Sequence, residues 1–256
     1  MNPLETLPLV LFVVLFELAV GGTLAMVLLE RAADTPLGFL RLTASVDLVA
    51  AALGALIIPS LPAEARTAAR LGYVVAALMA ATLAAAVTPS APVRRVAETV
   101  TAAAGVVLLV AASTARRGDA YDVLALAALP VGALALGGVD AAMLLGHWYL
   151  VTPKLSPRPL QTAALMFVGA VALQTLLLVL AYSRGFVAIA WDANAVATAL
   201  RVFVGIAAPL PIALAAWWTA RLNTQSSTGL LYVALAMVLA GEIMARMLFY
   251  VADVPI

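Results

Sequence analysis

Residues 6–29 read TLPLVLFVVLFELAVGGTLAMVLL, an apolar stretch in which Glu17 is the single charged residue. A helix needs about 20 apolar residues to cross the roughly 30 Å of hydrocarbon in a bilayer, and this stretch is long enough. No Lys or Arg lies between Met1 and Thr6, so the stretch lacks the basic region of a cleavable signal peptide. We therefore interpret it as the first transmembrane helix.

Seven more apolar segments follow at short intervals, at residues 37–60, 67–88, 96–115, 121–150, 159–183, 195–220 and 228–252. Hydrophobic residues make up 65% of the chain and charged residues 11%. Soluble domains are about half apolar and a quarter charged. Because backbone exposed to lipid must satisfy its own hydrogen bonds, each segment should be a helix. The sequence predicts an all-α integral membrane protein of about eight transmembrane helices, with both termini on one side.

A weak internal repeat suggests two parallel four-helix bundles, residues 1–118 and 119–256, within this single membrane domain. Gly21-Gly22 in the first segment matches Gly137-Gly138 in the fifth, and four spans restore the starting direction. Such matches also arise by chance in a chain rich in Ala, Leu, Val and Gly. Lys and Arg are divided almost evenly between the two sides, so the positive-inside rule does not set the orientation.

Residue counts limit the chemistry, because the chain has no cysteine and a single histidine, His147. Thiolate iron–sulfur clusters, Cys-rich zinc sites and thiol relays need cysteines. A b-type haem bound on both faces needs two imidazoles, or one imidazole and a thioether. We therefore expect no haem, iron–sulfur cluster or metal site built by this chain alone. A net charge of +1 without a basic tract argues against nucleic acid as a partner.

Six ionisable residues lie well inside the predicted spans: Glu17, Asp47, Asp140, Arg201, Glu242 and Arg246. A charge in hydrocarbon is costly unless it faces protein or water, so each is a candidate functional residue. Glu242 and Arg246 are four residues apart and therefore share a helix face. They form either a structural ion pair or a site that keeps the carboxylate charged and oriented. Together with Glu17 and Asp47, they indicate a proton path or a polar cavity.

The segment Gly146-His147-Trp148-Tyr149, at the end of the fifth apolar stretch, is the strongest local candidate for ligand binding. It offers an imidazole that exchanges protons near neutral pH, an indole donor and a phenol. A quinone ring needs flat apolar walls, hydrogen bonds to two carbonyls and a source of protons. Asp140, two turns deeper, could relay those protons or orient the imidazole. The alternative is an interfacial aromatic belt with a histidine at its edge.

The chain resembles the membrane-anchor subunits of the molybdopterin oxidoreductases, the dimethyl sulfoxide reductase anchor and polysulfide-reductase-like subunits. The resemblance rests on the number of spans with almost no ligand residues, on ELAVGG at residues 17–22, and on GEIMARMLFY at residues 241–250. It implies two four-helix bundles, no haem, and a quinone site near a soluble iron–sulfur subunit. Glu242 and Arg246 match the pattern of the family's final helices, whereas the segment around His147 has no counterpart there.

Our first hypothesis is a membrane subunit of a multi-subunit respiratory oxidoreductase in a bacterial cytoplasmic membrane. It would bind menaquinone or ubiquinone near the membrane interface and conduct the quinone's protons. Partner iron–sulfur and catalytic subunits would hold the metals, so this chain would be quinone-reactive or non-catalytic. The alternatives are a small proton-coupled secondary transporter that uses Glu17, Asp47 and Glu242, and a purely structural anchor surrounded by membrane lipid.

Overall fold

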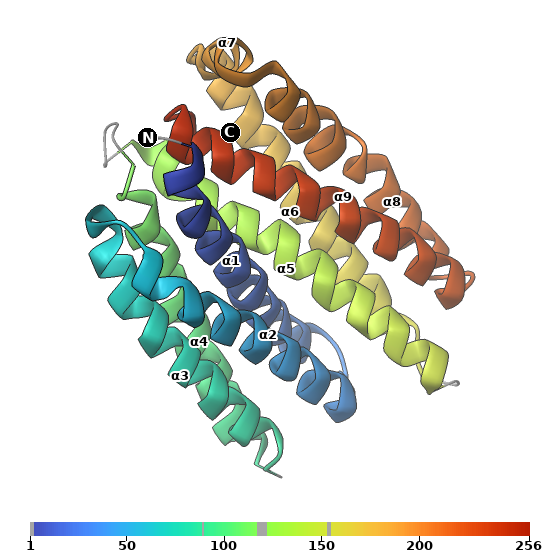
Figure 1. Cartoon of the computed structure of the whole chain (residues 1–256). Coiled ribbons are helices and arrows are strands. Elements are labelled where there is room, and N and C mark those ends of the chain that lie inside the picture. The colour runs from blue at the N-terminus through green and yellow to red at the C-terminus, as the bar shows by residue number, and fades with distance from the viewer. Residues whose placement is uncertain (1–2, 89, 117–121, 153–154) are drawn as a thin grey trace.

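The computed structural model is a single bundle of long helices (Figure 1). It describes residues 3–88, 90–116, 122–152 and 155–256. Helix makes up 88% of the chain, and the described residues contain no strand. Eight helices in this part are long and apolar enough to cross a membrane. The predicted all-α, multi-pass membrane fold is therefore confirmed.

Seven of the spans each contain one α-helix: α1 (Pro3–Ala32), α2 (Leu37–Ile57), α3 (Arg66–Ala86), α4 (Ala91–Ser113), α5 (Val123–Val151), α6 (Arg158–Ser183) and α9 (Thr224–Val251). The remaining span joins α7 (Phe186–Ala199), the π-helix η3 (Leu200–Ala207) and α8 (Pro209–Thr219). Two 3-10 turns, η1 (Ile58–Ser60) and η2 (Ala63–Ala65), connect α2 to α3. We call the end where α1 begins and α9 ends the terminus side, and the opposite end the loop side.

Local sequence explains where several helices begin and end. The carboxylate of Asp122 accepts a hydrogen bond from the Leu124 backbone at 3.1 Å, which caps the start of α5. Asn223 caps α9 in the same way, with its side-chain oxygen 2.8 Å from the Gln225 nitrogen. Gly185 separates α6 from α7 at a φ of 79°, a left-handed conformation that glycine adopts without steric cost.

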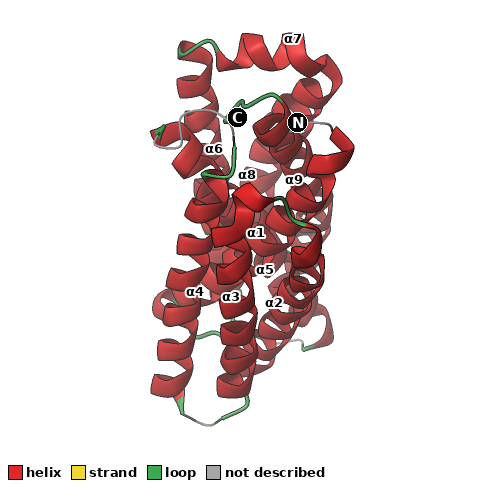
Figure 2. Ribbon diagram, turned by 60° about the vertical axis from the view of Figure 1, so that its left-hand side comes forward, coloured by secondary structure: helices red, strands yellow, loops and turns green. Residues whose placement is uncertain are grey.

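The seventh span is irregular for identifiable reasons. Asn194 has non-helical backbone angles, and the part of α7 before it lies across the terminus side of the bundle (Figure 2). The predicted span of 195–220 therefore begins just after the kink. Pro209, at the start of α8, lacks the backbone N–H that an α-helix would use. Just before it, the Ala208 nitrogen bonds the Phe203 carbonyl, five residues back, at 2.9 Å. This wider turn is the π-helix, a form found frequently at functional sites.

Helices α1 and α5 lie at the centre of the bundle, with α2–α4 on one side and α6, α8 and α9 on the other (Figure 1). The backbones of α1 and α5 touch where Gly21 meets Gly137. A Cβ atom added to Gly137 would lie 2.2 Å from the Gly21 carbonyl carbon. The two Gly-Gly motifs of the sequence thus meet at one crossing, where small residues let helices approach closely.

The predicted boundary between halves, at residues 118 and 119, lies outside the described residues, and the division into halves stays a prediction.

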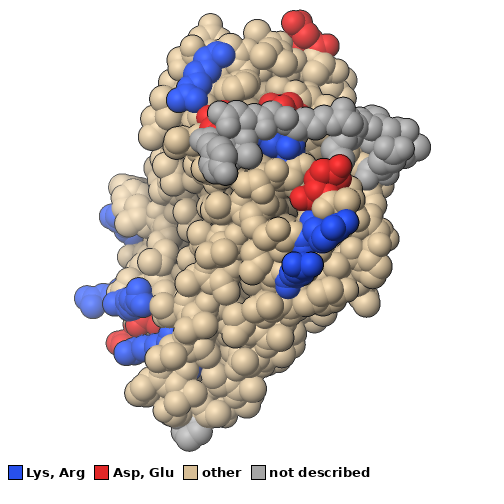
Figure 3. All heavy atoms as spheres, turned by 90° about the vertical axis from the view of Figure 1, so that its left-hand side faces the viewer, with Lys and Arg blue, Asp and Glu red and all other residues tan. Residues whose placement is uncertain are grey.

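The interior and the lateral outer surface are both largely apolar, and they differ in where the ionisable side chains lie. Large apolar side chains fill the interior, among them Phe12, Phe16, Phe39, Phe167 and Phe249, all fully buried. On the face shown in Figure 3, uncharged side chains cover most of the lateral surface. Such a surface suits lipid, and it leaves the buried ionisable residues of the interior as the unusual feature of the molecule.

Candidate functional site

Two glutamates and two arginines meet inside the bundle, and we call them the ion-pair cluster: Glu17 of α1, Arg201 of η3, and Glu242 and Arg246 of α9. Glu242 binds both arginines, with Oε1 2.6 Å from Arg201 Nη1 and Oε2 2.7 Å from Arg246 Nη2. Glu17 Oε1 lies 3.2 Å from Arg246 Nε. The four charges balance, and no side chain of the cluster is more than 4% exposed. Charge balance is what permits such burial.

Neighbouring helices complete the surroundings of this cluster. The Gln174 side chain of α6 donates a hydrogen bond to Glu242, and Arg246 Nη2 lies 3.3 Å from the Ala128 carbonyl of α5. Gly132 of α5 leaves room for the charged groups, because a Cβ there would lie 2.6 Å from Glu242 Oε2 and 2.7 Å from Arg246 Nη2. Four different segments besides α9 therefore contribute to one polar centre.

Close packing of η3 against α9 brings Arg201 into the cluster. Gly205 and Gly241 face each other, and a Cβ on Gly241 would lie 2.2 Å from the Gly205 Cα. Arg201 lies one turn before Gly205, and Glu242 directly follows Gly241. The glycine contact thus sets the distance between the guanidinium and the carboxylate.

Glu17 is the least satisfied member of the ion-pair cluster. Both of its carboxylate oxygens are buried, and neither has a hydrogen-bond partner within the described part of the chain. Its single ion pair, to Arg246 Nε, lacks hydrogen-bond geometry. Buried polar groups almost always have partners, so an unsatisfied carboxylate needs an explanation such as a water molecule or a proton-transfer role.

Two aspartates, Asp47 of α2 and Asp140 of α5, form a second buried group that we call the aspartate pair. They lie within electrostatic range of each other, and no Lys or Arg among the described residues forms an ion pair with either one. Asp47 Oδ2 accepts a hydrogen bond from Thr23 at 3.0 Å. Asp47 Oδ1 and Asp140 Oδ2 have no hydrogen-bond partner in the described part of the chain.

Helix α1 connects the two groups. Asp47 packs directly on Gly22, where an added Cβ would lie 2.2 Å from Oδ1. Glu17 is five residues before Gly22 on the same helix, which corresponds to a rise of about 7.5 Å. Five residues also turn the chain by about 140° around the helix axis, so the two carboxylates lie on different faces of α1 and the rise is not the distance between them. Both Glu17 and Asp47 are completely buried in the interior of the protein.

Further polar groups extend this line toward both sides of the membrane. On the terminus side, Tyr250 lies one turn beyond Arg246, and its hydroxyl donates to the Ala112 carbonyl at 3.0 Å. Beyond it, Arg116 Nη1 lies 3.3 Å from Asp253 Oδ1. On the loop side, Thr43 lies one turn from Asp47, and its buried hydroxyl has no hydrogen-bond partner among the described residues.

The residues predicted to bind quinone do not converge on one cavity. His147 is exposed, and its Nδ1 lies 2.9 Å from the Tyr232 hydroxyl of α9, with the two rings edge-to-face. Trp148 instead packs against Gly38 of α2, and the Tyr149 hydroxyl donates to the Ser156 carbonyl. Asp140 lies deeper, near Asp47. The quinone site at His147, Trp148, Tyr149 and Asp140 stays a prediction. Of these four, His147 is the exposed one, and Tyr232 of α9 lies beside it on the surface.

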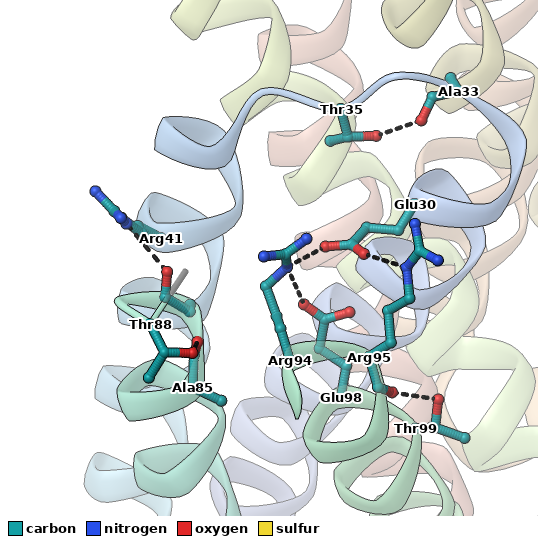
Figure 4. A network of polar contacts seen from close by, with 11 residues as sticks. Glu30, Ala33, Thr35, Arg41, Ala85, Thr88, Arg94, Arg95, Glu98 and Thr99 are labelled. Atoms are coloured by element: carbon teal, nitrogen blue, oxygen red, sulfur yellow. Dashed lines mark hydrogen bonds and ion pairs between the residues drawn. The ribbon is translucent and has the colours of Figure 1, made fainter. Parts of the chain in front are cut away.

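A third ionic group lies at the loop side, between α1 and α4 (Figure 4). Glu30 accepts from Arg94 Nε at 2.5 Å and from Arg95 Nε at 3.1 Å. Arg94 Nε also lies 3.9 Å from Glu98 Oε1, on the next turn of α4. This group is nearer the membrane boundary. Its two arginines match its two acids in number, but neither carboxylate oxygen of Glu98 has a hydrogen-bond partner among the described residues. Among the described residues, no three His, Cys, Asp or Glu side chains gather as metal ligands would.

Comparison with protein-family models, curated proteins and solved structures finds no match to this chain. The resemblance to molybdopterin oxidoreductase anchors therefore stays a prediction. The arguments that follow depend on the geometry of this chain alone.

Sequence reasoning missed two contributors to these sites and did not place a third. Gln174 was not considered because it is uncharged, although an amide inside an apolar segment is itself a signal of a buried contact. Tyr232 was missed as the partner of His147 because the two are 85 residues apart. Arg201 was recognised as an intramembrane charge, but its position beside Glu242 depends on the π-helix and on a glycine contact between helices.

Proposed function

We propose that this chain conducts protons through the membrane as a subunit of a quinone-linked respiratory oxidoreductase complex. The observation that supports it best is the line of buried ionisable groups formed by the ion-pair cluster and the aspartate pair. Intramembrane carboxylates on several helices are typical of proton relays. In this proposal the membrane is a bacterial cytoplasmic membrane, and the metals belong to partner iron–sulfur and catalytic subunits.

The two groups have different parts in the proposed path. No described Lys or Arg forms an ion pair with Asp47 or Asp140, so either can accept or release a proton without breaking an ion pair. The unsatisfied oxygens of Glu17 offer the next acceptor along α1. Glu242 binds Arg201, Arg246 and Gln174. In this proposal it has a structural part, because it fixes the positions of the two arginines beside the path.

Quinone chemistry enters at the loop side, at the His147–Tyr232 contact. An imidazole and a phenol 2.9 Å apart on the exposed edge of α5 and α9 offer hydrogen bonds to a quinone carbonyl and a group that exchanges protons. Asp140 is seven residues from His147 on α5, a rise of roughly 10 Å, and would supply those protons from inside the bundle. Menaquinone and ubiquinone both have the carbonyl groups that this contact requires.

The first experiment is purification of the chain from its native membrane in mild detergent, followed by mass spectrometry of the co-purifying proteins. Stoichiometric iron–sulfur or molybdopterin subunits are the expected result.

In that complex, His147→Ala and Glu17→Gln should each lower the rate of quinol-linked turnover, whereas Arg66→Gln, an exposed change on α3, should not. Unchanged turnover in both test variants would contradict the proposal and favour a purely structural anchor.

The second candidate, a proton-coupled secondary transporter, is favoured by the irregular seventh span. Transporter sites are typically formed by discontinuous helices near the middle of the membrane. Here a kink at Asn194 and a π-helix precede α8, and the π-helix holds Arg201 against Glu242. A homogeneous oligomer of this chain without redox partners, which dissipates a pH gradient when reconstituted into liposomes, would favour this function over the first.

A further inference from the structure

A cavity of about 690 Å³ lies at the loop side, outside the ion-pair cluster and the aspartate pair, and it borders the third ionic group at Glu30. Its walls come from the end of α1, the start of α6 and the end of α8. Three arginines line it, one from each of these places: Arg31, Arg158 and Arg221. All three are exposed to solvent, and helices that are distant in sequence bring them together.

None of the three guanidinium groups has a carboxylate partner within the described part of the chain. Arg31 Nη2 has a long contact of 3.4 Å with the Thr99 hydroxyl. Arg221 stacks on the Trp217 ring, with its Cζ 4.3 Å from the ring centroid. These contacts hold the side chains without neutralising their charge.

The acidic residues of the cavity do not balance this charge. Glu30 lines the cavity, but Arg94 and Arg95 already bind both of its oxygens (Figure 4), and its side chain is 4% exposed. Asp34 is the other carboxylate in the walls, and no ion pair involves it among the described residues. The cavity thus contains three arginines without an ion pair among the described residues and one such carboxylate, Asp34, so its net charge is positive.

We propose that this cavity binds a phosphate group. Guanidinium groups form paired hydrogen bonds with phosphate oxygens, and three of them around one space match the three or four oxygens of such a group. Ser156, Gln161 and Thr162 add neutral hydrogen-bonding groups to the walls. Trp217 and the exposed Leu165 bring apolar surface to the same place, which is the composition found at the headgroup level of a bilayer.

The phosphate could belong to an anionic lipid headgroup or to a free phosphate ion, and one experiment separates these sources. The purified protein, with any co-purifying subunits, is stripped of lipid and titrated with phosphatidylglycerol, with phosphatidylcholine of the same acyl chains, or with inorganic phosphate. Binding is measured by native mass spectrometry. The test variant is Arg158→Gln/Arg221→Gln, and the matched control is Arg66→Gln/Arg70→Gln, which removes two exposed arginines of α3 at the terminus side.

The proposal predicts tighter binding of phosphatidylglycerol than of phosphatidylcholine, weakened roughly tenfold in the test variant and unchanged in the control. Binding of inorganic phosphate that depends on Arg158 and Arg221 would support the site and assign it to the free ion. Equal binding of both lipids together with no arginine-dependent binding of phosphate would overturn the proposal. Equal weakening in the test and control variants would also overturn it, because binding would then follow total charge.

Discussion

The ion-pair cluster and the aspartate pair lie in the same bundle, about one and a half helical turns apart along α1, yet they hold their charges in opposite ways. In the first, two acids and two arginines form three ion pairs of 2.6–3.2 Å. In the second, two acids lie near each other, and the described residues provide no cation. Removing one member of the cluster therefore strands a buried charge, whereas removing one aspartate does not. The comparison predicts that the cluster matters most for stability and the aspartate pair most for proton movement.

Arg246→Gln should have the largest effect on stability, because it leaves Glu17 without its ion pair and Glu242 with Arg201 alone. Breaking a buried ion pair by removing one partner typically costs about 3–5 kcal/mol. The free energy of unfolding, measured by titration with sodium dodecyl sulfate, should fall by that amount. Arg66→Gln, an exposed control, should change it little. Equal free energies of unfolding for Arg246→Gln and Arg66→Gln would show that the ion-pair cluster does not stabilise the bundle.

Gly132→Ala should have the next largest effect, since its new methyl group would lie 2.6 Å from Glu242 Oε2 and force the ion pairs apart. Overpacking in a close-packed core costs about 1–3 kcal/mol. Gly138→Ala is a matched control on the same helix, because no heavy atom lies within 4 Å of the added Cβ. The same unfolding titration compares the two. A loss of stability in Gly138→Ala as large as that in Gly132→Ala would mean that helix contacts at Gly132 are not the cause.

Asp47→Asn should change stability by less than about 1 kcal/mol, because the amide has the same shape and can still accept the hydrogen bond from Thr23. No arginine loses a partner in this variant. Destabilisation comparable to that of Arg246→Gln would remove the distinction between the two groups. It would indicate that Asp47 has a charged partner in the membrane-embedded protein.

Thr23→Val should have the smallest effect, because it removes one hydrogen bond to Asp47 and keeps the shape of the side chain. Hydrogen bonds between membrane helices contribute about 0.6 kcal/mol on average. The loss should disappear when Thr23→Val is introduced into an Asp47→Ala background, as a double-mutant cycle would show. An undiminished loss in that background would assign the effect to the contacts of the Thr23 hydroxyl with the Ala19 carbonyl or with Met79.

Sequence patterns predicted the spans well because membrane insertion depends on hydrophobicity that is local to each segment. They also placed Glu242 and Arg246 on one face, because a spacing of four residues fixes that relation in any helix. They could not place Glu17 beside Arg246 or Asp140 near Asp47, because those contacts depend on how helices pack. The glycines that set this packing, Gly21 with Gly137 and Gly205 with Gly241, resemble any other small residues in an apolar sequence.

The segment around His147 illustrates the same limit. Three adjacent residues at the end of a helix point in three directions, so their proximity in sequence does not create one site. Trp148 and Tyr149 pack inward against α2 and the chain after α5, and only His147 meets an exposed partner, Tyr232. A helical projection gives the directions but not the neighbours that each side chain meets.

Proton uptake by the purified complex in liposomes tests the central claim most directly. A pH-sensitive dye would follow uptake during quinol-linked turnover, in Asp47→Asn and in Asp34→Asn, an exposed acid at the loop side. The account predicts that Asp47→Asn lowers the uptake rate at least about tenfold while the protein stays as stable as the unmodified chain. Asp34→Asn should keep the full rate. Full proton uptake in a stable Asp47→Asn complex would contradict the account.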